Sequence, residues 1–312
     1  MAISPGRILI TGASGFVGRH LMIALASAFP DAALLAPAFD VANAADVTNV
    51  VREAAPDACI HLAAISTSAQ VRPNEDRAWA VNLHGTLHLA RAILLHAPGC
   101  QLVFASTADA YGASFRHGAK LHEGAPLAPL NVYAATKAAA DLALGAMVEQ
   151  GLVVVRLRPF NHTGTGQSSG LVVAAFARQI ARIAAGLQEP MISVGNLEPR
   201  RDFLDVRDVC GAYVACVARR DVIEPGAIFN IASGDVRRIG DVLDALQEIA
   251  GVAAEIRVDP SRTRTTDVPQ AWCDPGRARD VLGWAASTPW SQTLRDVLDD
   301  WRRRIAVELE SP

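Results

Sequence analysis

The sequence predicts an α/β protein built on a doubly wound parallel sheet, and three observations support this fold class. Short apolar runs alternate with Ala-rich stretches of helical spacing through the first half of the chain. The apolar runs are continuous, as expected for parallel strands that are buried on both faces. The chain has 312 residues, 51% of them hydrophobic, which is enough for one large unit with a smaller attached lobe.

In the first half, each expected strand is followed by an expected helix. Strands are expected at 7–11, 33–36, 58–62, 101–106 and 152–157, and helices at 16–29, 44–54, 74–97 and 131–149. Strands joined in this way run parallel through right-handed crossovers and carry helices on both faces.

The regular alternation of expected strands and helices ends at about Phe160. After a Gly-rich loop at 161–170 and a helix, we expect strands near 191–194 and 201–206, a loop at 260–269, and helices at 274–282 and 290–304. We therefore divide the chain into a first domain at 1–160 and a smaller C-terminal α/β lobe at 161–312 that interleaves with it.

Composition and charge exclude several classes of partner. The formal net charge is -3, so the basic excess of a nucleic-acid-binding protein is absent. No apolar run reaches membrane-spanning length, and the N-terminus has no signal-peptide pattern. The five cysteines are scattered without metal-ligand spacing. We expect a cytoplasmic protein with no membrane contact, no nucleic-acid partner and no metal site.

Residues 11–18 (TGASGFVG) have the spacing of a dinucleotide-binding loop between a strand and a helix. Gly12 allows a tight turn, Gly15 lets the backbone approach a pyrophosphate, and Gly18 lets the helix pack close to the sheet. The helix N-terminus supplies free N–H groups and partial positive charge for the phosphates. The expected cofactor contacts in this loop are Gly12, Ser14, Gly15, Phe16, Val17 and Gly18.

Asp40 and Val41 follow the second expected strand, where a carboxylate can accept a hydrogen bond from an adenine amino group. An ordinary turn Asp fits the position equally well. Residues 36–38 contain neither an acidic partner for a ribose 2'-hydroxyl nor an Arg cluster for a 2'-phosphate. The choice between NAD and NADP therefore stays open.

Tyr133 and Lys137 lie four residues apart and share one face of an expected helix. A free Tyr titrates near ~10, and a nearby ammonium is expected to lower that value. The phenol can then exchange a proton with a carbinol oxygen, while Lys137 also holds the nicotinamide ribose.

Ser106 and Thr107 end the fourth expected strand, at the sheet edge where ligands of open α/β sheets bind. We expect the Thr107 hydroxyl to bond the same substrate oxygen as Tyr133. For Ser106 we expect a hydroxyl that is satisfied within the strand end.

Together these motifs resemble the extended short-chain dehydrogenase/reductase family, also called the NAD-dependent epimerase/dehydratase family, along essentially the whole chain. The resemblance implies a Rossmann fold that binds NAD(P)H, with further cofactor contacts at Leu62, Ala63, Ala64 and Phe160. It also implies a homodimer that pairs helices 74–97 and 131–149 in a four-helix bundle.

Residues 158–167 (RPFNHTGTGQ) are similar to the RPFNHxGPGQ stretch of GDP-6-deoxy-D-mannose reductases, except that Thr165 replaces a Pro. Residues 194–208 and 264–269 (RTTDVP) fit the same subfamily. The resemblance implies that Asn161, Arg201 and Arg264 hold the nucleotide diphosphate, which suits the bidentate geometry of Arg with phosphate.

The resemblance implies reduction of the C4 ketone of GDP-4-keto-6-deoxy-mannose. Catalysis would rest on Thr107, Tyr133 and Lys137. Rival interpretations are a nucleotide-sugar 4,6-dehydratase or 4-epimerase and, from another class, a non-catalytic dinucleotide sensor. The dehydratases of the family place a Glu base at the position of Asp109 and an acid or hydroxyl at Ala108, so elimination is disfavoured here. For His162 we expect a packing role.

Overall fold

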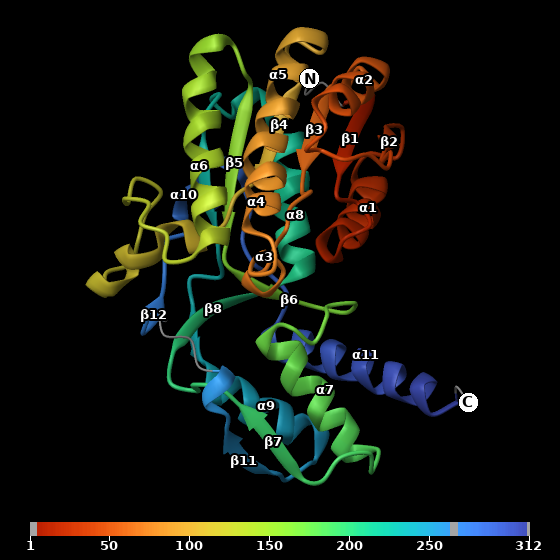
Figure 1. Cartoon of the computed structure of the whole chain (residues 1–312), viewed down its shortest axis with the longest axis vertical. Helices are drawn as coiled ribbons and strands as arrows, with labels where there is room; N and C mark the ends of the chain where they lie inside the picture. Colours follow the sequence, from red (N-terminus) through yellow and green to blue (C-terminus); the bar gives the residue numbers. More distant parts are fainter. Residues whose placement is uncertain (1–4, 263–267, 311–312) are drawn as a thin grey trace.

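The computed structural model describes residues 5–262 and 268–310, and it contains the expected parallel sheet. Six strands stand in the order β2-β1-β3-β4-β5-β9, and all their pairings are parallel. The strands are β1 (Arg7–Thr11), β2 (Ala33–Leu35), β3 (Ala58–His61), β4 (Gln101–Ala105), β5 (Val154–Pro159) and β9 (Ile228–Ile231). The α/β doubly wound fold class is confirmed (Figure 1).

Alternate residues of β1, β3, β4 and β5 face two separate cores. Ile8 and Ile10 belong to one core, with helices α1 (Phe16–Ala28), α8 (Val206–Ala218) and α10 (Gly276–Leu282). Leu9 faces the other core, with helices α2 (Ala44–Ala54), α5 (Thr86–His96) and α6 (Val132–Ala146). Helices therefore cover both faces of the sheet, and the continuous apolar strands of the sheet are buried on both sides.

The smaller lobe lies below the sheet in Figure 1 and has its own apolar core. Helices α7 (Val172–Ala184), α9 (Ile239–Ala250) and α11 (Trp290–Glu310) pack on its strands. Its strands are β6 (Asn161–Thr163), β7 (Met191–Val194), β8 (Arg200–Asp205), β10 (Val236–Arg238), β11 (Glu255–Val258) and β12 (Gln270–Ala271). Because β8 pairs with β6, β10 and β12, it is the central strand of this lobe.

The C-terminal half of the chain contributes to both parts of the molecule. Strand β9 pairs with β5 and completes the large sheet, while α8 packs against α1. The chain thus returns to the sheet after entering the smaller lobe. None of the helices in the ranges given above is long and apolar enough to cross a membrane.

The prediction of one continuous helix at 74–97 is wrong in one respect, because the structure has three consecutive helical segments in this range. They are α4 (Glu75–Trp79), the π-helical stretch η1 (Ala80–Gly85) and α5. The wider turn occurs where the Asn82 side chain bonds the backbone of Ile65. Two further short segments are α3 (Ser68–Val71) and the 3-10 segment η2 (Ala108–His117). Three more 3-10 turns are η3 (Met147–Gln150), η4 (Arg220–Val222) and η5 (Pro260–Arg262).

Candidate active site

The Gly-rich loop packs directly on the end of β3. Gly12 has φ +74°, and a Cβ on it would lie 2.7 Å from the amide nitrogen of Ala63. Only Gly tolerates both this backbone conformation and this close approach. Strands β1 and β3 flank the point where the strand order of the sheet reverses. The loop after β1 therefore lies against the residues that follow β3, which include the predicted contacts Leu62, Ala63 and Ala64.

Gly18 permits a contact that differs in detail from the one expected. A Cβ on Gly18 would overlap the carbonyl oxygens of Gly12 and Ala13, so the close approach is between α1 and the loop, not the sheet itself. Gly15 occupies the N-cap of α1 with no side-chain cap. The first-turn amides of a helix have no intrahelical partner and form an anion-binding end. The predicted contacts Ser14, Phe16 and Val17 belong to this cradle, which fits a dinucleotide pyrophosphate.

Asp40 and Val41 lie beside η1. The Asp40 carboxylate accepts two hydrogen bonds of 2.9 Å from Arg77 and one from the amide of Ala42. The Ala42 amide and Arg77 hold the pKa of Asp40 below its usual value despite some desolvation. Val41 is buried against Gly85, where a Cβ would lie 2.9 Å from Val41 Cγ2.

Thr107, Tyr133 and Lys137 converge at the carboxyl edge of β4 and the first turns of α6. The Thr107 hydroxyl bonds the Tyr133 phenol and also accepts the amide of Asp109. Lys137 is buried one turn further along α6, with Nζ 4.2 Å from the centre of the Phe104 ring. The structure thus places these three predicted residues in one cluster.

The pKa of Tyr133 departs from the expected direction. Desolvation raises the pKa of the phenol, the Asp109 carboxylate raises it further, and only the hydrogen bond with Thr107 opposes the rise. Burial also lowers the pKa of Lys137 to about 7, although Asp141 counteracts this shift. The pKa of Tyr133 is therefore raised and not lowered, so its phenol is protonated at neutral pH.

Ser106 has the structural role that we expected. Its hydroxyl donates to the fully buried Asp141 at 2.7 Å. The same carboxylate accepts bonds of 2.9 and 3.0 Å from Arg158 and one of 3.2 Å from Arg156. This buried network fixes the end of β4 against α6, directly behind Thr107.

Asn161 and Arg201 lie on the paired strands β6 and β8. Asn161 is the register partner of Phe203, and Arg201 precedes Phe203 by two residues, so both side chains project from one face. Arg264 lies outside the described residues, and its place stays a prediction.

Sequence analysis missed Arg237 as a candidate for this face. It is the register partner of Arg201 on β10. Its guanidinium lies 5.2 Å from the Trp290 ring, and Nη1 is buried without a hydrogen-bond partner among the described residues. Only strand register reveals this juxtaposition, because no motif in the sequence marks Arg237.

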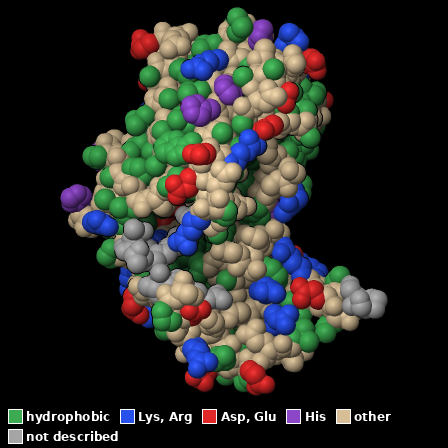
Figure 2. All heavy atoms as spheres, in the orientation of Figure 1, with side chains coloured by type: hydrophobic (Ala, Val, Ile, Leu, Met, Phe, Trp, Pro, Cys, Tyr) green, Lys and Arg blue, Asp and Glu red, His purple; other side chains and the backbone are tan. Residues whose placement is uncertain are grey.

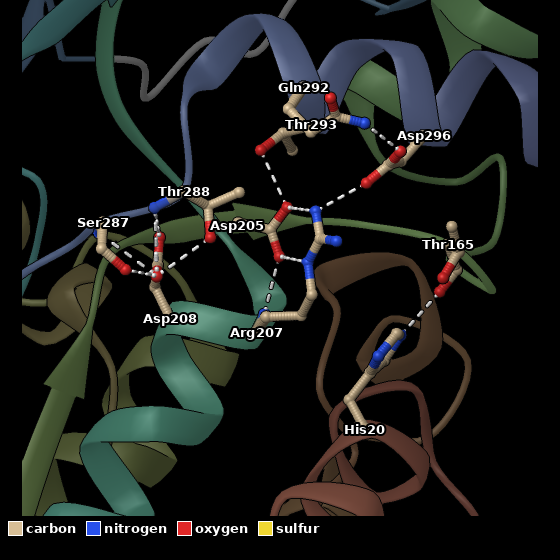
Figure 3. Close-up of polar contacts among 10 residues, drawn as sticks. All are labelled: His20, Thr165, Asp205, Arg207, Asp208, Ser287, Thr288, Gln292, Thr293 and Asp296. Atoms are coloured by element: carbon tan, nitrogen blue, oxygen red, sulfur yellow. Dashed lines mark hydrogen bonds and ion pairs between the residues drawn. The ribbon is translucent and has the colours of Figure 1, made fainter.

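The loop that follows β6 is attached to the cofactor helix. His162 stacks on Phe16 at 6.2 Å and bonds the carbonyl of Phe160, which agrees with a packing role. Figure 3 shows His20 of α1 donating to the carbonyl of Thr165 at 2.8 Å. Because the contact uses the backbone, the replacement of Pro by Thr165 leaves it intact.

A second set of contacts in Figure 3 attaches α11 to α8. Asp205 caps α8, binds Arg207 and accepts the Thr293 hydroxyl at 2.8 Å. Arg207 also binds Asp296. These ion pairs give Arg207 a structural role, and they connect α11 of the smaller lobe to α8, which packs on the sheet.

Comparisons with known proteins agree with this geometry. A family model described as "NAD dependent epimerase/dehydratase family" matches residues 8–232. The chain is 36% identical over 305 residues to the GDP-6-deoxy-D-mannose reductase of Pseudomonas aeruginosa, a match that covers 97% of this chain and 99% of the relative. It is 29% identical to the GDP-6-deoxy-D-talose 4-dehydrogenase of Aggregatibacter actinomycetemcomitans, with the same coverage of 97% and 99%.

A solved structure, that of RMD from Pseudomonas aeruginosa complexed with NADPH, is similar over almost its whole length. The TM-score is 0.87 at 35% identity, and the match covers 96% of this chain and 99% of the other. The similarity therefore includes the large sheet, the smaller lobe and their relative arrangement.

Proposed function

This chain belongs to the NAD-dependent epimerase/dehydratase family, and on that premise we propose that it reduces GDP-4-keto-6-deoxy-mannose at C4 with NADPH or NADH. The product is GDP-6-deoxy-D-mannose. One observation carries this proposal: the chain is 36% identical to a GDP-6-deoxy-D-mannose reductase over nearly the full length of both proteins. The fold, the Gly-rich loop and the cluster of Thr107, Tyr133 and Lys137 support it.

The raised pKa of Tyr133 suits the reductive direction. When bound, the nicotinamide supplies a hydride to C4 of the substrate. Tyr133 donates its phenolic proton to the ketone oxygen, and Thr107 orients that oxygen by a second hydrogen bond. A phenol that stays protonated at neutral pH is the form that can act as this acid. Lys137 holds the nicotinamide ribose from the same face of α6.

The other assigned residues bind the two nucleotides. The cradle at the N-terminus of α1 holds the cofactor pyrophosphate, with Asp40 and Val41 at the adenine and Phe160 beside the nicotinamide. Asn161, Arg201 and Arg264 hold the diphosphate of the sugar nucleotide. Strands β6 and β8 present Asn161 and Arg201 to one face, which supports a shared phosphate site at these two residues.

A 4,6-dehydratase is the second candidate, and Ala108 and Asp109 argue against it. Such an enzyme must also remove a proton from C5 and expel the C6 hydroxyl as water. Ala108 is a buried methyl group that can relay no proton. Asp109 is one methylene shorter than the Glu of the dehydratases, and misplacement of ~1 Å can reduce the rate on the order of a hundredfold.

Asp109→Asn distinguishes the two reactions. We expect the variant to retain much of the ketone reduction, because reduction needs Thr107, Tyr133 and a hydride only. Loss of ketone reduction in a natively folded Asp109→Asn variant would contradict this expectation. If the wild type instead converts GDP-mannose to the 4-keto sugar with no net change in the cofactor, Asp109 becomes the base and the dehydratase is favoured.

The protein is further proposed to form a homodimer in the cytoplasm. Leu95 on α5 and Leu142 on α6 are exposed, at 73% and 60%, on adjacent helices. Figure 2 shows hydrophobic side chains gathered where α6 lies. A four-helix bundle would cover them, and Leu142→Glu should yield a monomer in sedimentation analysis. The five buried thiols fit a reducing compartment.

A further inference from the structure

His61 connects the Gly-rich loop with the helix that begins at Thr86. Its imidazole is completely buried at the end of β3. Nδ1 lies 2.7 Å from the hydroxyl of Thr11, the residue before Gly12. Nε2 lies 3.0 Å from the hydroxyl of Thr86, the first residue of α5. One side chain thus bridges the cofactor edge and the long helical segment.

The partners of the two hydroxyls determine how the protons are arranged. Thr86 donates its only proton to the carbonyl of Asn82 at 2.7 Å, so its oxygen must accept from Nε2–H of His61. Thr11 accepts the amide of Ala63 at 3.2 Å, and its own proton is free for Nδ1. All bonds are satisfied by one neutral tautomer, with the proton on Nε2.

The chain of hydrogen bonds continues from Asn82 to the helix that carries the proton donor. Asn82 donates to the hydroxyl of Thr136 at 3.0 Å, and Thr136 donates to the carbonyl of Tyr133 at 2.7 Å. Asn82 also exchanges bonds of 2.8 and 3.0 Å with the backbone of Ile65. Asn82 belongs to the π-helical stretch η1, and such stretches often occur at functional sites.

We propose that His61 is a positioning residue with two separable tasks in the proposed reduction. Nδ1 holds the cofactor edge through Thr11 and Ala63. Nε2 holds η1, and through Asn82 and Thr136 it sets the position of the first turn of α6. This inference rests on the proposed function, because it assigns parts of the same active site.

The surroundings of His61 keep the imidazole neutral. Burial and the nearby Lys137 lower its pKa to about 3. The Phe104 ring covers it at 6.0 Å. The required tautomer is therefore present throughout the neutral range, and both bonds persist while the enzyme works.

Two isosteric substitutions separate the tasks. In His61→Asn, the amide oxygen can replace Nδ1 as the acceptor for Thr11, while the donor to Thr86 is lost. In His61→Gln, the amide nitrogen can replace Nε2 as the donor to Thr86, while the acceptor for Thr11 is lost. Each variant keeps one contact and leaves one buried hydroxyl without its partner.

The proposal predicts opposite kinetic effects for the pair. His61→Gln should weaken NADPH binding, followed by fluorescence titration, by roughly tenfold with little change in kcat. His61→Asn should lower kcat by roughly tenfold with nearly native NADPH affinity. Thr11→Val and Thr86→Val should reproduce the Gln and Asn patterns, respectively, since each removes the matching hydroxyl.

A purely structural role gives a different outcome. If both His61 variants only lower the melting temperature, with unchanged NADPH affinity and kcat per folded enzyme, the proposal is overturned. If the wild type does not reduce the 4-keto sugar, the proposed function fails, but two readouts remain. NADPH affinity still tests the Nδ1 task, and amide exchange of Ile65 should accelerate in His61→Asn but not in His61→Gln. Equal exchange in both variants would refute the Nε2 task.

Discussion

Tyr133 and Lys137 share one face of α6. Burial raises the pKa of Tyr133 and lowers the pKa of Lys137, so it favours the neutral form of both side chains. For Tyr133 this preserves the proton that the ketone oxygen must receive. Tyr133→Phe should reduce turnover by about two or more orders of magnitude, the usual scale for a general acid. NADPH affinity should change little, because the phenol is lost but the ring remains. Near-native turnover measured in steady state would remove Tyr133 from its assigned role.

The buried ammonium of Lys137 should make the free protein less stable. Its pKa falls from 10.5 to about 7 on folding, so the unfolded chain binds more protons between these values. Stability therefore decreases as pH falls from about 10.5 to 7, and below pH 7 the full destabilisation persists without further change. Lys137→Met should be inactive but more stable than the wild type. The difference in free energy of unfolding should grow as pH falls from about 10.5 to 7. Denaturant unfolding at several pH values measures the margin, and a pH-independent difference would contradict the shift.

Arg201 and Arg200 are neighbours on β8 whose side chains project from opposite faces, so they form a matched pair. Arg201→Ala should weaken GDP-sugar binding by ~1.5–3 kcal/mol, the value of a charge-assisted hydrogen bond. Arg200→Ala should have little effect, because its side chain is exposed on the other face. Calorimetry with GDP measures both, and equal affinities in the two variants would remove Arg201 from the phosphate site.

At the scale of elements, the packing of α1 on the Gly-rich loop is tested by Gly18→Ala. The added methyl group would overlap the carbonyl oxygen of Gly12, and such overpacking costs about 1–3 kcal/mol. We expect weaker NADPH binding, since the loop must move. Gly211→Ala is the control: it lies in α8, where a Cβ would meet Trp284 Nε1 at an ordinary 3.6 Å. It should be neutral or stabilising, by up to ~1 kcal/mol. Native NADPH affinity in Gly18→Ala would refute the packing argument.

Sequence patterns predicted the elements whose ends and faces depend on local signals, such as a capping residue or a regular apolar face. The helix at Ala44–Ala54 begins and ends as expected, because Asn43 caps it and its apolar face is regular. The π-helical stretch at Asn82 could not be predicted, because it depends on a bond to Ile65, which reaches η1 only in the folded chain. The same limit applies to Tyr133, whose pKa depends on burial that a motif does not describe.

For the whole molecule, sequence patterns predicted the doubly wound sheet but not how the second half returns to it. Strand β9 joins the sheet through register with β5, a long-range pairing with no local signature. The neighbourhood of Arg201 and Arg237 likewise depends on register between β8 and β10. Sequence motifs therefore indicated candidates that lie close together along the chain, such as Tyr133 and Lys137, but not the neighbours that strand pairing brings together, such as Arg201 and Arg237.

The central claim is that this chain reduces a 4-keto sugar and does not create one. The most direct measurement incubates purified enzyme with GDP-4-keto-6-deoxy-mannose and NADPH or NADH, and follows cofactor oxidation and sugar product together. We expect one cofactor oxidised for each GDP-6-deoxy-D-mannose formed, and no reaction of GDP-mannose. Conversion of GDP-mannose to the 4-keto sugar, with no net change in the cofactor, would contradict the account.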